Sequence, residues 1–133
     1  MNITTAEIRK AVKDSIGHLG LQVYYAEDLP SGEITQERAV IVTSSDSFGN
    51  IWSTCLVTLS VCVPDLAPRV ANLSRLNKLE RIIQATFHDG YVGSKGDDDY
   101  CISLDKIGIE YDTQFKCHFV NAKLVFKTLN VKN

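Results

Sequence analysis

Apolar side chains near the start of the chain recur at helical spacing. They share one side of a helical wheel and are Ile8, Val12, Ile16 and Leu19. This spacing predicts a short amphipathic helix with one buried stripe. Thr4 followed three residues later by Glu7 is a capping-box pattern, which places the start of the helix directly after Thr4. Gly17 or Gly20 supplies the stop, because glycine commonly ends helices.

Strands follow this helix. Leu21–Ala26 and Ala39–Ser45 are rich in apolar and β-branched residues, and the polar segment between them contains Pro30 and Gly32. We therefore expect two strands joined by a loop. Residues 46–50 then supply aspartate, glycine and asparagine, which are the residues that a hairpin turn requires.

A third predicted strand, Ile51–Val63, is unusually long. Its apolar residues of one parity are Ile51, Cys55, Val57, Leu59, Val61 and Val63. Trp52 and Leu56 share the other parity with polar residues. Strands usually span about 3–10 residues, and this run would extend roughly 40 Å at ~3.3 Å per residue. We expect part of it to project beyond the core, with a free edge that meets another chain.

A second helix is predicted over about Pro68–Phe87. One broad apolar arc of its helical wheel contains Leu73, Leu76, Leu79, Ile83 and Phe87. Arg75, Lys78 and Arg81 occupy the opposite side. A basic helix face can contact phosphates, but a solvated surface is the interpretation that this pattern favours.

The last third of the chain predicts a turn-rich loop over His88–Asp99 and then two strands. Ile107, Ile109 and Tyr111 alternate in the first of these strands. In the second, the apolar residues change parity near Val120–Asn121. Such a change predicts a β-bulge or a strand that changes partners.

These elements predict a single α+β domain over residues 1–133, in the order α-β-β-β-α-β-β. Its sheet should be mainly antiparallel, with four to five strands and two helices packed on it. The length of 133 residues fits one domain. A content of 44% hydrophobic and 23% charged residues is ordinary for a globular protein.

The formal net charge of −2 argues against a protein that grips nucleic acid or an anionic membrane with its whole surface. The N-terminal segment lacks the apolar core of a signal peptide. No apolar run approaches the ~18 residues that span a bilayer. We therefore expect a chain that is made and kept in a cytosol.

The four cysteines are expected to be small buried thiols. Cys55, Cys62, Cys101 and Cys117 lie in apolar segments and form no closely spaced pair, whereas zinc sites usually draw ligands from such pairs. Cys55 and Cys62 are seven residues apart, so on one strand they point to opposite faces and cannot form a disulfide.

The triplet Asp97, Asp98 and Asp99 is the most chemical-looking stretch, because carboxylates bind Mg²⁺ and Ca²⁺. Consecutive residues rarely aim all their carboxylates at one point. Calcium loops space their ligands at alternate positions, and two-metal nucleases gather carboxylates from separate elements. We therefore interpret the triplet as an acidic surface loop that holds neither a metal nor a cofactor.

No catalytic motif is found elsewhere. His18, His88 and His118 are isolated in the sequence. The nucleophile elbow GxSxG and the phosphate-binding patterns GxxxxGK[ST] and GxGxxG do not occur. We therefore expect a protein that is not an enzyme.

Taken whole, the chain resembles the tail terminator and tail-completion proteins of long-tailed phages, a family of small α+β proteins of head–tail joining. The resemblance covers nearly the whole chain. It rests on the length, the helix AEIRKAVKDSIG, the hairpin SSDSFGNIWSTCLVTLSVCV, the helix LNKLERIIQATF and the closing pair of strands. These matches are architectural, so no functional residue is carried over by identity.

The resemblance implies a structural virion protein of a bacteriophage that assembles in the host cytoplasm. It would form a homo-oligomeric ring, commonly a hexamer, that ends the tail tube and joins it to the head connector. The expected partners are further copies of itself, the tail tube protein and the head connector protein, with DNA passing through without specific binding and with no membrane.

Two groups of residues are candidates for these contacts. Phe48, Ile51, Trp52 and Thr54 are expected at the subunit or tube interface, since an overlong strand can pair with a neighbouring sheet. The aspartates 97–99 are expected at the rim or lumen of the ring.

Three alternatives stay open: another neck or connector ring protein of the same fold, a small nucleic-acid-binding module that uses Arg75, Lys78 and Arg81, and a metal-dependent nuclease centred on the aspartates.

Overall fold

The computed structural model describes residues 4–44, 54–95 and 98–128. In chain order the elements are α1 (Thr5–Ser15), η1 (Gly17–Leu19), β1 (Gln22–Tyr25), η2 (Ala26–Asp28), β2 (Arg38–Thr43), β3 (Thr54–Pro64), α2 (Leu73–Phe87), β4 (Tyr91–Lys95), β5 (Asp98–Asp112) and β6 (Cys117–Thr128). The two η elements are short 3₁₀ helices. The predicted α+β class is confirmed.

The six strands of the described residues form one sheet in the order β1-β2-β3-β6-β5-β4. β1 and β2 are parallel, and the other neighbouring pairs are antiparallel. The prediction of four to five strands was therefore wrong, and the sheet is mixed. The missed strand is β4, which lies inside the segment predicted as the loop His88–Asp99.

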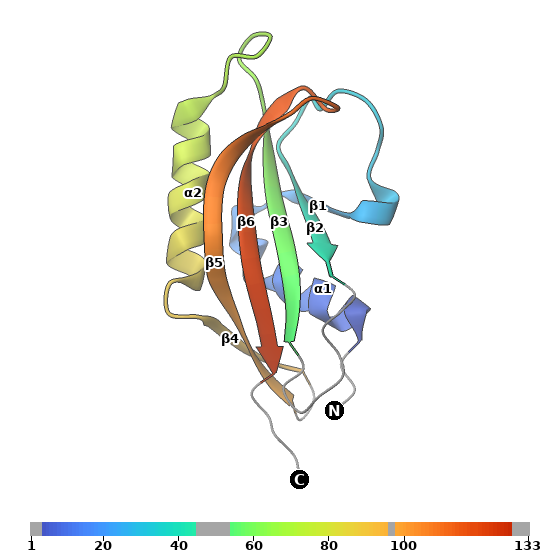
Figure 1. The fold of residues 1–133 in the computed structure, drawn as a ribbon, viewed down its shortest axis with the longest axis vertical. Helices are drawn as coiled ribbons and strands as arrows, with labels where there is room; N and C mark the ends of the chain where they lie inside the picture. The colour runs from blue at the N-terminus through green and yellow to red at the C-terminus, as the bar shows by residue number, and fades with distance from the viewer. Residues whose placement is uncertain (1–3, 45–53, 96–97, 129–133) are drawn as a thin grey trace.

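Both α-helices pack on the same face of the sheet (Figure 1). α2 lies along β5 and β6, whereas α1 contacts β2 and also β4, four places apart in the sheet. The sheet therefore curls around α1. This helix begins as predicted. The Thr4 hydroxyl accepts a hydrogen bond from the Glu7 backbone N–H at 3.1 Å, and the Glu7 carboxylate accepts one from the Thr4 backbone N–H at 3.1 Å.

Strand β3 occupies the centre of the sheet. It pairs with β6 along its whole length from Thr54 to Pro64, and its other side pairs with β2 from Val57 to Cys62. The predicted free edge is therefore wrong for residues 57–62, which are paired on both sides. The length of β3 is used inside the sheet, because its neighbour β6 is longer still. Residues 51–53 lie outside the described residues.

Strand β6 buries side chains on both faces, which explains the change of parity in its sequence. Those that face the helices in the main core are Val120, Ala122, Leu124 and Phe126. Cys117 and Phe119 belong to a second cluster on the opposite face. The ladder between β6 and β3 is regular, so the bulge predicted near Val120–Asn121 is wrong. The irregularity lies in β5, between Leu104 and Lys106.

Helix α2 is shorter than the predicted Pro68–Phe87. Its first residue is Leu73, because the Asn72 side chain caps it by accepting a hydrogen bond from the Arg75 backbone N–H at 3.3 Å. The buried positions agree with the predicted apolar arc at Leu76, Leu79, Ile83 and Phe87. Leu73 does not agree, since it is 57% exposed in the first turn.

The β4–β5 hairpin has its register set by a close approach. Gly93 lies opposite Tyr100, and a side chain at Gly93 would overlap the Tyr100 ring. The ring of Tyr100 is buried and stacks on Phe126 with centroids 5.2 Å apart. Glycine is depleted in ordinary strands, so the sequence favoured a loop here. The glycine is present because an aromatic ring crosses the edge strand.

We expect Leu76→Ala or Ile83→Ala to lower the free energy of unfolding by roughly 2–5 kcal/mol, because both side chains are fully buried. Leu73→Ala makes the same change at an exposed position, and together with Lys78→Ala it should stay within about 0.5 kcal/mol. Urea denaturation measures all four variants. Equal losses at Leu73 and Leu76 would contradict the assigned helix face.

Candidate assembly surface

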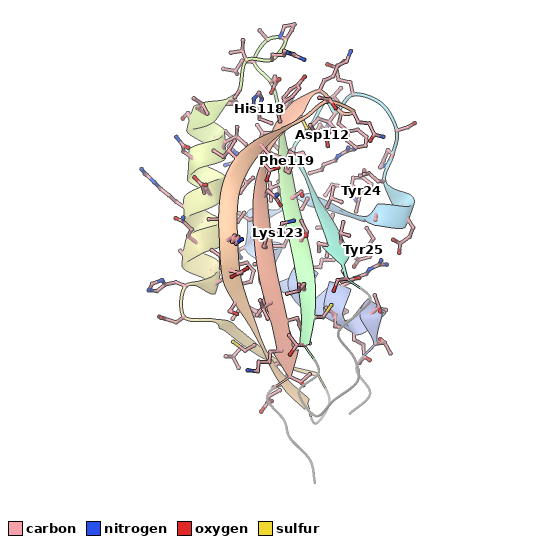
Figure 2. The ribbon with its side chains drawn as sticks, in the orientation of Figure 1. Tyr24, Tyr25, Asp112, His118, Phe119 and Lys123 are labelled. Carbon is pink, nitrogen blue, oxygen red and sulfur yellow. The ribbon has the colours of Figure 1, made fainter. Side chains whose placement is uncertain are left out.

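The sheet face opposite the helices is covered at one end by irregular segments. The loop of residues 29–37 and the β5–β6 turn form a second buried cluster there, made of Ile34, Cys62, Phe115 and Cys117. Asp112 holds the turn, since its Oδ1 accepts hydrogen bonds from the backbone N–H groups of Gln114 at 2.8 Å and Phe115 at 3.0 Å. Figure 2 shows Asp112 and Phe119 at this end.

The other end of the same face is open. Leu56 on β3 is 55% exposed and Val42 on β2 is 42% exposed. Both line a surface cavity of about 410 Å³ together with Lys106 and Lys123, and Lys123 lies midway along β6 (Figure 2). We call these four residues the open-face patch. It combines an apolar centre with the cations Lys106 and Lys123, and Asp105 lines the same cavity.

A second exposed apolar group lies around the turn before α2. Leu66, Val70 and Leu73 are the residues of this apolar knob, and Leu66 is 69% exposed. The backbone N–H of Leu66 donates to the Val70 carbonyl at 2.8 Å. Arg69 adopts φ 63°, a left-handed conformation that is uncommon for a long side chain. A strained turn that exposes several apolar side chains is typical of a contact surface.

Buried polar groups fasten the knob to β6. Oδ1 of Asp65 accepts a hydrogen bond from the His118 backbone N–H at 3.2 Å and lies 2.8 Å from Nδ1 of the same residue. The His118 ring contacts Tyr111 with centroids 4.9 Å apart, and the Arg69 guanidinium lies 5.5 Å from the Tyr111 ring centroid. The Asp65 side chain is only 7% exposed. These contacts form a structural clamp beneath the turn.

The same cluster borders a cavity of about 550 Å³, which Asp65, Arg69 and Tyr111 line. A carboxylate that orients an imidazole is also the geometry of a general base. Here the carboxylate lines the cavity and His118 does not. The arrangement therefore supports a clamp better than a catalytic dyad.

The predicted basic face of α2 is partly neutralised. Nε and Nη2 of Arg75 donate to the two carboxylate oxygens of Glu37 at 2.7 and 2.8 Å, and this contact raises the pKa of Arg75. The bidentate pair joins α2 to the segment before β2. Lys78 and Arg81 are exposed. Two of the three predicted cations therefore face solvent, and the third, Arg75, is paired with Glu37.

Most residues of the predicted interface lie outside the described residues, namely Phe48, Ile51 and Trp52. Thr54 begins β3, two residues from Leu56 and on the same face of the sheet. The open-face patch is therefore continuous along β3 with the region that the sequence singled out. The interface itself stays a prediction.

The aspartate triplet does not form a loop in its described part. Asp98 and Asp99 begin β5, and Asp97 lies outside the described residues. The hydroxyl of Ser94 on β4 donates to Asp99 Oδ1 at 2.7 Å. Asp99 is exposed, and the two described aspartates belong to the β4–β5 hairpin.

The sequence carried a signal for part of this surface that its interpretation left out. Leu56 shares a parity with Thr54 and Thr58, and an apolar residue on a polar parity indicates a contact on the solvent side of a strand. The apolar knob gave no such signal, since Leu73 matched the helical stripe of the core. The N-cap at Asn72 shows that Leu73 lies in the first turn of α2, and its exposure shows that it lies outside the core.

His18 in η1 contacts helix α2. The Nε2 atom of His18 lies 3.1 Å from the Thr86 hydroxyl. In the parts of the chain that the structure describes, no group of three or more His, Cys, Asp or Glu side chains could hold a metal ion. Across the same stretches, every helix is too short or too polar to cross a bilayer.

Comparison with known proteins identifies a fold and no family. No protein-family model matches the chain, and no curated protein matches its sequence. A solved structure whose name states no function aligns with 99% of this chain and 100% of its own, at 12% sequence identity and a TM-score of 0.67. At this identity the likeness shows a shared fold alone.

We expect Asp65→Asn to lower the free energy of unfolding by about 1–3 kcal/mol, because it weakens hydrogen bonds made by a buried carboxylate. Asp99→Asn makes the same change at an exposed residue and should stay within about 0.5 kcal/mol. Chemical denaturation measures both. A loss at Asp65 no larger than that at Asp99 would show that the clamp contributes nothing.

Proposed function

We propose that this protein is a structural virion subunit, a tail terminator that assembles as a ring, most simply a hexamer, between a phage tail tube and the head connector. The observation that carries the proposal is the presence of large apolar side chains outside the core at two separate places, the open-face patch and the apolar knob. Exposed apolar groups of this kind mark contact surfaces.

The positions of the two surfaces favour a ring over a two-fold dimer. Leu56 lies near the beginning of β3, and Leu66 follows the end of the same strand. The surfaces are therefore separated by almost the length of β3. When one surface of a subunit meets a different surface of the next, the contact is heterologous and repeats until the ring closes.

The edges of the sheet offer further contacts. β1 has four residues and β4 has five, and Val92 on β4 is 63% exposed. An edge strand has unpaired backbone groups that a strand of a neighbouring protein can complete. Edge pairing between subunits or with the tail tube would join the sheets across a ring.

The charge of the chain suits a conduit for DNA. The formal net charge is −2, and Asp99 is exposed at the β4–β5 hairpin. Acidic surface weakens contact with phosphates, so DNA can slide past. The nucleic-acid-binding alternative would use the basic face of α2, but Arg75 is engaged there by Glu37. A neck or connector ring of the same fold fits these surfaces equally well, and the position of the ring in the particle separates the two.

Imaging of assembled particles tests the proposal. We expect a single ring of this protein between the tail tube and the head connector. A ring at another level of the neck would favour the connector alternative. Absence from the particle, or dispersal in the capsid shell, would contradict both.

Two variants test the surfaces. Leu56→Asp and Leu66→Asp place a charge on the open-face patch and on the apolar knob, and each should leave a folded subunit that fails to enter the ring, because burying an unpaired carboxylate is costly. Gln84→Glu adds a charge at an exposed position of α2 and should assemble normally. Circular dichroism checks the fold, and particle composition checks incorporation. Normal incorporation of both aspartate variants would remove these surfaces from the proposal.

A further inference from the structure

A buried arginine lies on the covered end of the open sheet face. Arg38 is only 8% exposed, and its guanidinium lies 4.7 Å from the Phe115 ring centroid and 5.7 Å from that of Tyr24. Within the described residues, its Nε and Nη2 atoms are buried without a hydrogen-bond acceptor. The positive charge therefore lies near two aromatic rings, and in the part of the chain that the structure describes the Nε–Nη2 edge of the guanidinium has no acceptor.

A buried charge without a partner destabilises a fold. Arg75 on α2 shows how a guanidinium is paired elsewhere in this protein. Arg75 uses the equivalent atoms, Nε and Nη2, to hold both oxygens of Glu37. Among the described residues, no carboxylate lies at ion-pair distance from Arg38, which distinguishes this guanidinium from that of Arg75.

The residue directly opposite Arg38 in the β2–β3 ladder is Cys62. Cys62 is 5% exposed, and Cys117 on β6 is fully buried in the same small cluster. In the β3–β6 ladder Cys62 pairs with Phe119 and Cys117 pairs with Pro64. The two cysteines are therefore diagonal neighbours on one face, at the last pairs of the ladder.

The surroundings of the two thiols shift their pKa values in opposite directions, so that Cys62 loses its proton more readily than Cys117. A hydrogen bond from the Cys117 thiol lowers the pKa of Cys62, and the Arg38 charge lowers it further, whereas burial and Asp112 oppose the shift. The contact with Cys62 raises the pKa of Cys117. The charged groups that face Cys62 are thus Arg38 from β2 and Asp112 from β5, while the covering loop contributes the apolar Ile34.

We propose that Cys62 is a thiolate that serves as the counter-ion of Arg38, and that hydroperoxides oxidise it, with Cys117 as the thiol that completes a disulfide. The guanidinium edge without an acceptor, the register that places Cys62 opposite it, and the second thiol in contact carry this inference together. Low-pKa cysteines beside a cation and a second thiol are the ones that respond to oxidants.

The reaction balances with hydrogen peroxide as the oxidant. The Cys62 thiolate attacks one peroxide oxygen, the O–O bond breaks, and hydroxide leaves, which takes up a proton to become water. The sulfur is then a sulfenic acid. Cys117 attacks that sulfur, its proton leaves with the displaced hydroxyl group as a second water, and the S–S bond forms. Each molecule of peroxide thus accepts two electrons from the pair of thiols.

Access of an oxidant to the thiols requires movement of the covering loop, and formation of the disulfide also requires the end of the β3–β6 ladder to open. Ile34, which packs in the cluster with both thiols, also lines the cavity of about 550 Å³ and a smaller one of about 280 Å³ that Arg38 borders. Hydrogen peroxide is close to water in size. The end of a strand ladder opens more readily than its centre, which lets the two sulfur atoms approach bonding distance.

Ultraviolet absorbance of the thiolate measures the first half of the proposal in the intact protein. The difference between wild type and Cys62→Ser should titrate with a midpoint below about 8.5, the ordinary value for cysteine. Arg38→Met should raise that midpoint by at least one unit, which is about tenfold less thiolate below it. Arg38→Lys keeps the charge and should give a value between the two. A wild-type midpoint at or above about 8.5, or no change in a folded Arg38→Met protein, would overturn the proposal.

Mass spectrometry after brief exposure to hydrogen peroxide measures the second half. We expect a disulfide that joins the Cys62 and Cys117 peptides, and in Cys117→Ser a sulfenic acid at Cys62 that dimedone captures. The half-exposed Cys101 is the internal control. Arg38→Met should slow oxidation of Cys62 about tenfold relative to Cys101, following the loss of thiolate, and Arg38→Lys should slow it less. Oxidation of Cys101 before Cys62 in the wild type, or a disulfide from Cys62 to another cysteine, would overturn the proposal.

Discussion

The continuous pairing of β3 with β6 is the interaction on which the rest of the structure depends. These two strands form the middle of a six-stranded sheet and share an unbroken ladder from Thr54 to Pro64. One face of this ladder supplies the centre of the main core beneath both helices. The other face carries the thiol cluster at one end and the open-face patch at the other. The open-face patch and the cluster of the two thiols are thus held in place by the same backbone hydrogen bonds.

Local patterns predicted the elements whose causes are local. The capping box at Thr4 and the buried stripe of α1 follow from neighbouring residues, and so do the buried positions of α2 from Leu76 onward. The errors came from contacts between distant segments. Gly93 indicates a loop until Tyr100 is placed across it, and the change of parity in β6 has no cause until both faces of the strand are covered. For the candidate surfaces, the sequence pointed to the start of the long strand, but exposure of the knob and the pairing of Arg75 depend on tertiary geometry.

The two ends of the open sheet face differ in what they can do. At the covered end, a loop and a turn enclose a guanidinium, two thiols and two aromatic rings, and such groups give a reactive site. At the open end, Leu56 and Val42 face solvent beside lysines, and such groups give a contact surface. The arrangement explains how a chain that is proposed to act through assembly also contains two thiols whose pKa values are shifted in opposite directions. Arg38 and the two thiols are enclosed at the covered end of the sheet, away from the open-face patch that a neighbouring subunit would contact.

The contact between Gly93 and Tyr100 also sets the register of the edge strand β4 on β5. If β4 slid by one residue along β5, Val92 or Ser94 would move opposite Tyr100, and the β-carbon of either would collide with the ring. This close approach therefore opposes a shift of β4 by one residue in either direction. The outward backbone N–H and C=O groups of β4 therefore have fixed positions relative to the rest of the sheet. These positions would set the register of a strand that pairs with this edge. Gly93 thus sets the register not only of β4 on β5 but also of any strand that pairs with the outer edge of β4.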